Sequence, residues 1–136
     1  MILTMNDVAI VYSDYYKEIS DGLITGIEAN LDPKFSIHKF NVKGSWEIIY
    51  KINELIDSKN FSKFIAVGVI CKGDTDHYEF ISQGVINGMI NTTVNKNVYI
   101  SNCVLNVHNL DQAKLRITDQ NNKGKESAEA LNNLFS

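Results

Sequence analysis

The sequence predicts an α/β protein, a three-layer α/β/α sandwich with a four-stranded parallel sheet. The main observation is a near-continuous apolar run from Phe64 to Cys71, which fits a strand buried on both faces of a sheet. Short apolar runs also alternate along the chain with segments whose apolar residues recur at helical spacing. Strands that alternate with helices form parallel sheets with right-handed crossovers and helices on both faces.

The composition narrows the class of protein. The 136 residues are 44% hydrophobic and 21% charged, which fits one globular domain over residues 1–136. A formal net charge of −3 gives no electrostatic support for nucleic-acid binding. No apolar run approaches the ~18 residues of a membrane span, and the N-terminus lacks the pattern of a signal peptide. Cys71 and Cys103 lack metal or redox spacing, so we expect buried thiols in a reducing, cytoplasmic compartment.

The first strand and helix are expected from two patterns. Val8 to Tyr12 is an apolar run, and Ser13 to Tyr16 follows as a loop. A helix should come next and end at Asp32-Pro33, because proline disfavours helix in the residue before it. Its apolar face is marked by Ile19, Leu23, Ile27 and Leu31.

A short strand and a second helix follow. Alternation from Phe35 to Phe40 predicts a strand at an edge of the sheet. Asn41 to Ser45 reads as a loop, and Ser45 is expected to cap a helix that runs to about Ser58. Glu47 lies in the first turn of that helix, where a carboxylate suits the helix dipole.

The buried strand leads into the third helix. Its apolar run breaks at Lys72 to Asp76, and helical spacing resumes from His77. Val98 to Leu105 predicts the fourth strand. The apolar stripe of the third helix is Ile81, Val85 and Met89.

Two helices are expected to close the chain. Asn109 can cap the first of them, with Gln112 three residues on in a capping-box-like arrangement. Asp119 to Gly124 reads as a polar loop, and Lys125 to Phe135 as the last helix. The apolar residues that support the first of the two are Leu110, Ala113 and Ile117.

Polar residues gather where the strands of the predicted sheet end. The loops 13–16, 72–76 and 106–108 follow three strands, and 44–47 follows the edge strand. Open α/β sheets bind ligands at this edge, and the free N–H groups of a helix start favour anions. Gly73 lets the backbone approach a ligand closely, Thr75 supplies a hydroxyl, and His77 can transfer protons near neutral pH.

Each of these residues also has an ordinary structural interpretation. His77 can be a surface histidine at a helix start, and Tyr15 can pack on its own loop. Trp46 and Glu47 are explained by helix-start packing and the helix dipole, and Arg116 by a solvated helix face. A metal site is a further alternative that we do not favour; its acidic cluster would be Asp74, Asp76, His77 and Glu79.

Four segments carry a more specific signal. They are GVICKGDTDHYEFI from Gly68, KGSWEI from Lys43, NLDQAKLR from Asn109 and NKGKESAEALNNL from Asn122. Together, and in this order, they resemble the motifs of the lumazine synthase family over nearly the whole chain. The first is similar to that family's G-[TA]-V-I-[RK]-G-x-T-x-H-[FY]-[DE]-x-[VI].

The resemblance implies a function in riboflavin biosynthesis. Such an enzyme, a transferase, condenses 5-amino-6-ribitylamino-uracil with 3,4-dihydroxy-2-butanone 4-phosphate. The products are 6,7-dimethyl-8-ribityllumazine, phosphate and water, and no cofactor or metal is used. The resemblance also implies a flavodoxin-like fold, small-molecule substrates and a homo-oligomer, a pentamer or a pentamer-based assembly, without a nucleic-acid or membrane partner.

The resemblance further implies which residues form the site. His77 stands at the position of the proton-transferring histidine, and Asn102 lines the pyrimidine pocket from a neighbouring subunit. The other substrate-binding residues are Tyr15 for ring stacking, Ser45, Trp46 and Glu47 for the ribityl chain, Val69, Ile70 and Cys71 for the pyrimidine, and Asp74, Thr75, Arg116 and Lys123 for the phosphate.

Several positions depart from the family pattern. Asp74 stands where a small residue is usual, Asp76 adds a second carboxylate, and Asn102 stands where a phenylalanine is common. Two acids beside a phosphate repel it unless nearby cations offset them. The sequence therefore keeps open a non-catalytic flavin- or lumazine-binding protein on the same scaffold. A receiver-type signalling module is less compatible, because only Asp14 follows the first strand where paired acids are needed.

Overall fold

The computed structural model describes residues 3–73 and 77–136. Strands and helices alternate along the chain, as the sequence predicts. The elements are β1 (Asp7–Ser13), α1 (Lys17–Asn30), β2 (Ser36–Val42), the 3₁₀ turn η1 (Ser45–Glu47), α2 (Ile48–Lys59), β3 (Lys63–Cys71), α3 (His77–Lys96), β4 (Tyr99–Val107), α4 (Leu110–Lys114) and α5 (Lys123–Leu134).

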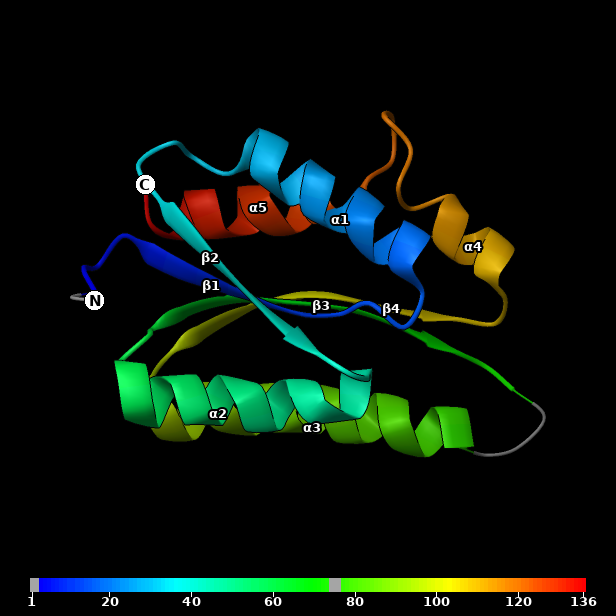
Figure 1. Cartoon of the computed structure of the whole chain (residues 1–136), viewed down its shortest axis with the longest axis horizontal. Helices are drawn as coiled ribbons and strands as arrows, with labels where there is room; N and C mark the ends of the chain where they lie inside the picture. The colour runs from blue at the N-terminus through cyan, green and yellow to red at the C-terminus, as the bar shows by residue number, and fades with distance from the viewer. Residues whose placement is uncertain (1–2, 74–76) are drawn as a thin grey trace.

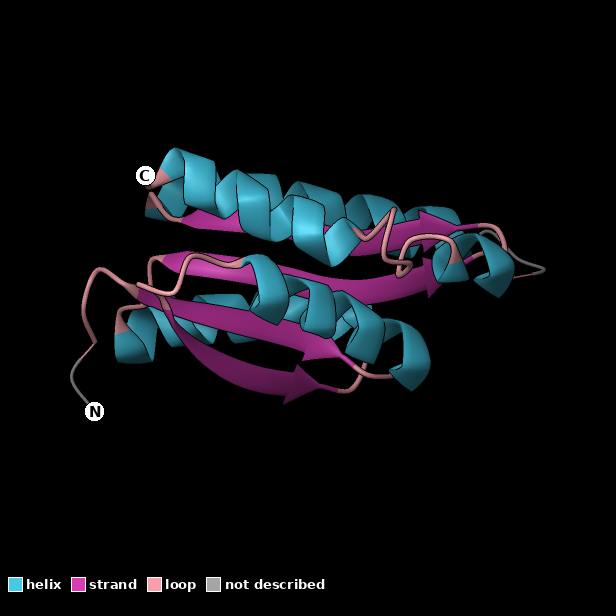
Figure 2. Ribbon diagram, turned by 90° about the horizontal axis from the view of Figure 1, so that it is seen from above, coloured by secondary structure: helices cyan, strands magenta, loops and turns pink. Residues whose placement is uncertain are grey.

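The four strands form one parallel sheet in the order β2-β1-β3-β4. Figure 2 shows the strands running in the same direction. This confirms the predicted fold class and places β2 at an edge, as its alternating pattern predicted. β3 lies between β1 and β4, so its carboxyl end is next to the point where the strand order reverses.

Helices cover both faces of the sheet (Figure 1). α1 and α5 pack on one face over Ile10, Ile65 and Val67, while α2 and α3 pack on the other over Val11 and Ala66. Every residue of β3 from its start to Ile70 is buried, which explains why its apolar run is so regular. Among the described residues, we find no helix that combines the length and apolar character needed to cross a bilayer.

Three local expectations were wrong. Ser45 does not cap a helix: Gly44 precedes η1, and no side chain caps that turn. Asn109 does cap α4 through the N–H of Gln112 at 3.0 Å, but α4 ends at Lys114 and Ile117 lies beyond it. α5 begins at Lys123 rather than Lys125, because Asn122 accepts a hydrogen bond from the Lys125 N–H and caps the helix two residues earlier.

The contact between α1 and α5 is close enough to require glycine. Gly124 in the first turn of α5 is buried, and a Cβ built on it would lie 2.0 Å from the carbonyl oxygen of Leu23 in α1. A backbone oxygen cannot move aside as a flexible side chain can, so the two helices would have to separate.

We therefore expect Gly124→Ala to lower the free energy of unfolding by about 1–3 kcal/mol, the usual cost of overpacking. Gly73→Ala is the control, because a Cβ there meets nothing within 4 Å, and it should change stability by less than about 0.5 kcal/mol. Denaturant titration of both variants measures the difference. Equal stability of the two variants would contradict the close packing of α1 and α5.

Candidate active site

A pocket of about 340 Å³ opens where β1 and β3 end. It lies at the reversal of strand order, the position at which open α/β sheets bind ligands. We call it the sheet-end pocket. Its lining residues are Tyr15, Tyr16, Gly44, Ser45, Trp46, Val69, Ile70, Cys71, His77, Tyr78 and Ile81.

Two exposed aromatic side chains border this pocket. Tyr15 is 74% exposed and meets the ring of Tyr16 edge-on, with centroids 4.9 Å apart. Trp46 is 60% exposed and lies over Gly84 of α3, where a Cβ would come within 3.0 Å of the indole ring. Both rings border the same pocket and are open to solvent, so they are suited to cover a flat ligand.

Ser45 brings a buried hydroxyl to the same pocket. The residue is 9% exposed, and its Oγ has no hydrogen-bond partner within the part of the chain that the structure describes. It lies against β3, since a Cβ on Gly68 would be 2.7 Å from this oxygen. A buried hydroxyl without a partner is costly, so Ser45 is placed to bond a ligand or water rather than to cap a helix.

His77 begins α3, and its exposed side chain borders the sheet-end pocket. It also borders an adjacent open hollow with Trp46, Phe80 and Ile81. An imidazole in this position reaches both the pocket and solvent. It can therefore exchange protons with a bound molecule and with water.

Cys71 and Tyr16 add polarizable and ionisable groups. Burial raises the pKa of the Tyr16 phenol, and the nearby Cys71 and Tyr15 raise it further. Tyr16 therefore stays neutral at physiological pH and can donate a hydrogen bond. Cys103 is buried as expected, but Cys71 is only half-buried, because it ends β3 at the pocket; its Sγ lies 3.9 Å from the carbonyl oxygens of Lys72 and His108.

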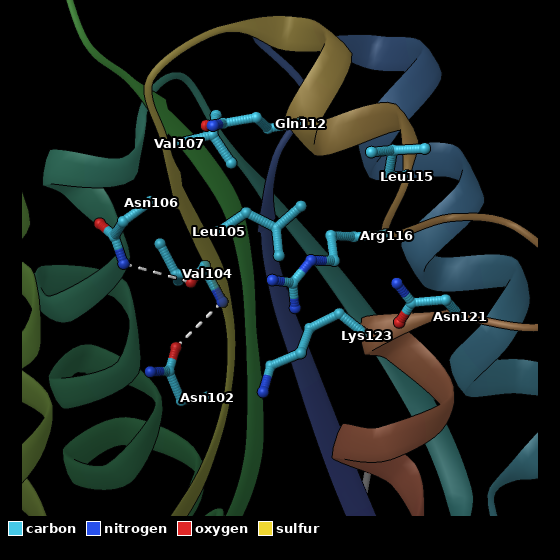
Figure 3. Close-up of a pocket in the computed structure, with 10 residues that line it drawn as sticks. All are labelled: Asn102, Val104, Leu105, Asn106, Val107, Gln112, Leu115, Arg116, Asn121 and Lys123. Carbon is cyan, nitrogen blue, oxygen red and sulfur yellow. Dashed lines mark hydrogen bonds between the residues drawn. The ribbon is translucent and has the colours of Figure 1, made fainter.

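A second pocket, of about 570 Å³, lies along the free edge of β4 (Figure 3). We call it the edge pocket. Arg116 and Lys123 both extend towards β4, and no carboxylate is among the described residues that line it. The full set is Asn102, Val104, Leu105, Asn106, Val107, Gln112, Leu115, Arg116, Asn121 and Lys123. Two cations among four amide side chains make a site for an anion.

The wall of the edge pocket is held in place by hydrogen bonds. The Asn102 Oδ1 accepts from the N–H of Val104 at 2.9 Å, and the Asn106 Nδ2 donates to the carbonyl of Val104 at 3.5 Å. Side chains of β4 thus form hydrogen bonds with the backbone N–H and carbonyl of Val104 at the open edge of the sheet. Ser127 of α5 lies within bonding distance of the carbonyl oxygens of Asn102 and Lys123, at 3.2 and 2.9 Å.

The structure divides the predicted site residues between these two pockets. Ten of the thirteen line one or the other, seven at the sheet end and three at the edge. Glu47 lies in η1 and lines neither, and Asp74 and Thr75 lie outside the described residues. The sheet-end group is Tyr15, Ser45, Trp46, Val69, Ile70, Cys71 and His77; the edge group is Asn102, Arg116 and Lys123.

Sequence reasoning missed Tyr78 at the sheet end and Asn121 at the edge. Tyr78 directly follows His77 at the start of α3, and Asn121 lies two residues before Lys123 in a polar loop, and these positions were the available signals. Within 3–73 and 77–136, no three His, Cys, Asp or Glu side chains come together as metal ligands. Asp74 and Asp76 of the acidic cluster are outside those ranges.

Comparison with known proteins identifies the family. A family model described as 6,7-dimethyl-8-ribityllumazine synthase matches residues 6–136. The chain belongs to the 6,7-dimethyl-8-ribityllumazine synthase family. This confirms the resemblance seen in the sequence, and the four-stranded parallel sheet agrees with the flavodoxin-like fold expected for lumazine synthases.

Individual relatives carry the same name. The Flavobacterium johnsoniae protein is 33% identical over 124 residues, which cover 88% of this chain and 65% of that protein. The Sphingopyxis alaskensis protein is 32% identical over 128 residues, covering 93% and 90% of the two chains. The Limosilactobacillus reuteri protein is 28% identical over 134 residues, covering 96% and 88%. These lumazine synthases support an enzyme of riboflavin biosynthesis acting on small molecules and do not favour the non-catalytic alternative.

The two thiols provide a direct test of the sheet-end geometry. Burial raises the pKa of the Cys103 thiol to about 11, so it should not react with iodoacetamide at pH 8 in the folded protein. Cys71 lines the sheet-end pocket and should be alkylated by iodoacetamide under the same conditions. Peptide mass spectrometry distinguishes the two sites, and a Cys71→Ser variant is the control. Faster labelling of Cys103 than of Cys71 would contradict this geometry.

Proposed function

We propose that this chain is itself a lumazine synthase that condenses 5-amino-6-ribitylamino-uracil with 3,4-dihydroxy-2-butanone 4-phosphate. The observation that carries the proposal is the division of the site between two pockets of complementary chemistry. One is bordered by aromatic rings and a histidine, and the other presents two cations. A flat heterocycle fits the first, and a phosphate ester fits the second.

The sheet-end pocket would hold the ribitylaminouracil. Its ring would stack on Tyr15, while main-chain groups of Val69, Ile70 and Cys71 bind the pyrimidine edge. The Ser45 hydroxyl and the Glu47 carboxylate would form hydrogen bonds with the hydroxyls of the ribityl chain. A carboxylate accepts such bonds, and a hydroxyl both donates and accepts them. The buried, unpartnered Oγ of Ser45 supports this orientation.

The edge pocket would hold the phosphorylated ketone. Arg116 would bind its phosphate in a charge-assisted contact, with Lys123 beside it. Asp74 and Thr75 are assigned to the same phosphate by the family pattern. Asn102 would approach the pyrimidine bound by the neighbouring copy.

A complete site would then require two copies of the chain. The residues that line the sheet-end pocket and those that line the edge pocket have no member in common. In a closed ring each copy would present its edge pocket to the sheet-end pocket of the next, a head-to-tail contact. We propose such a homo-oligomer, a pentamer or a pentamer-based assembly. The cytoplasmic location expected from the sequence remains a prediction.

The chemistry needs proton transfer and charge stabilisation. Imine formation, phosphate elimination and ring closure each move a proton, which His77 would carry. Arg116 and Lys123 would stabilise the departing phosphate. Holding the two substrates together in a reactive orientation can itself contribute roughly 7–11 kcal/mol. No step calls for a cofactor.

We expect Arg116→Ala to impair substrate binding and His77→Ala to impair turnover. A charge-assisted contact is worth about 1.5–3 kcal/mol, so Arg116→Ala should raise the KM for the phosphorylated ketone by roughly 10- to 100-fold. His77→Ala should leave the affinity for both substrates nearly unchanged. It should slow turnover by about 100-fold or less, because positioning remains and water can replace some proton transfers.

Single-turnover lumazine formation, followed by absorbance, measures these effects. Lys114→Ala is the matched control for Arg116→Ala: it removes an exposed cation from the adjacent helix α4 without lining the edge pocket. Equal rates for the parent and His77→Ala would exclude the histidine from the mechanism. If the assembled parent protein makes no lumazine from purified substrates, the proposed function is wrong.

A further inference from the structure

Two glycines of α1 lie beneath the segment that carries Arg116 and Lys123. Gly22 and Gly26 are four residues apart and so share one face of the helix. A Cβ on Gly22 would lie 2.8 Å from the Cβ of Ile117, and a Cβ on Gly26 would lie 2.2 Å from the Oδ1 of Asn122. Side chains beyond α4 therefore rest directly on the backbone of α1.

Ile117 and Asn122 are themselves paired. They form an isolated antiparallel bridge, next to which the N–H of Lys123 donates to the carbonyl of Arg116 at 2.9 Å. Ile117 and Asn122 contact α1, whereas the side chains of Arg116 and Lys123 extend towards β4, as Figure 3 shows. The segment that packs on α1 thus also carries both cations.

Asn122 makes two separate hydrogen bonds. Its Nδ2 donates to the carbonyl of Gly22 at 3.2 Å, and its Oδ1 accepts from the N–H of Lys125 at 3.1 Å. The second bond caps α5, but the first crosses to α1 and serves no helix end. Replacement by serine can keep a capping oxygen while removing the amide that reaches α1.

We propose that Gly22, Gly26 and Asn122 are positioning residues for the anion site of the edge pocket. Their contacts hold Arg116 and Lys123 at a fixed separation facing β4, although none of the three lines the pocket. The proposal rests on the proposed function only in taking the anion to be the phosphate of the second substrate. Anion binding itself can be tested without turnover.

α5 supplies a matched control residue. Asn132 also joins α5 to α1: its Nδ2 donates to the carbonyl of Asn30 at 2.8 Å, and its Oδ1 accepts from the N–H of Asp32 at 2.9 Å. These bonds lie at the far end of α1 from Gly22 and do not involve residues 116–123, which we call the bridged segment. A purely structural role would make Asn122→Ser and Asn132→Ser behave alike.

The experiment compares these two variants with the parent in the assembled protein. Inorganic phosphate, titrated by calorimetry, is the first probe, and substrate kinetics are the second. Asn122→Ser should weaken phosphate binding and raise the KM for the phosphorylated ketone by roughly tenfold each. Its KM for the ribitylaminouracil should change by less than about twofold. Asn132→Ser should change neither anion measurement, even if both variants melt at lower temperature.

Gly26→Ala provides an independent variant that removes no polar group. It should weaken phosphate binding by displacing the Asn122 amide, and its effect should be smaller in the Asn122→Ser background, where the shorter side chain leaves room. Unchanged phosphate affinity in Asn122→Ser, or an equal loss in Asn132→Ser, would overturn the inference. A parent that binds phosphate but makes no lumazine would refute only the proposed function.

Discussion

Burial of β3 on both faces is the constraint on which the rest of the structure depends. A strand enclosed by helices needs a neighbour on each side for its backbone groups, and parallel neighbours bring their carboxyl ends to one edge of the sheet. β1 and β4 meet this need. Each then ends beside the carboxyl end of β3, where Tyr15, Cys71 and His108 follow or terminate the three strands. The candidate site is a consequence of how the core is built.

The separation of aromatic and cationic groups follows from strand order. The sheet-end pocket opens at β1 and β3, whereas Arg116 and Lys123 lie along the outer edge of β4. α1 connects the two regions within one chain, since it begins beside Tyr16 and carries Gly22 and Gly26 under the bridged segment. Each half of the site therefore adjoins α1, and in the proposed oligomer a neighbouring copy would supply the other half.

Patterns local in sequence predicted most of this fold, and long-range contacts explain the remainder. The apolar run from Phe64 identified β3, but Lys63 was not expected inside it. Its ammonium is buried because the carbonyl of Met5 accepts from it at 2.6 Å and the Phe135 ring lies 4.5 Å away. Ser45 has the pattern of a cap, yet it packs on Gly68. Spacing identified His77 as a candidate, whereas Arg116 and Asn102 required the family resemblance.

The central claim, that one site combines two copies, is tested most directly by mixing two chains that are impaired in different halves of the site. One would carry Tyr15→Ala with Glu47→Ala, both at exposed positions, and the other Arg116→Ala. After unfolding and joint reassembly, roughly a quarter of neighbouring pairs should join an intact sheet-end pocket to an intact edge pocket. The account predicts lumazine synthesis at about that fraction of the parental rate. Mixed oligomers no more active than either variant alone would contradict it.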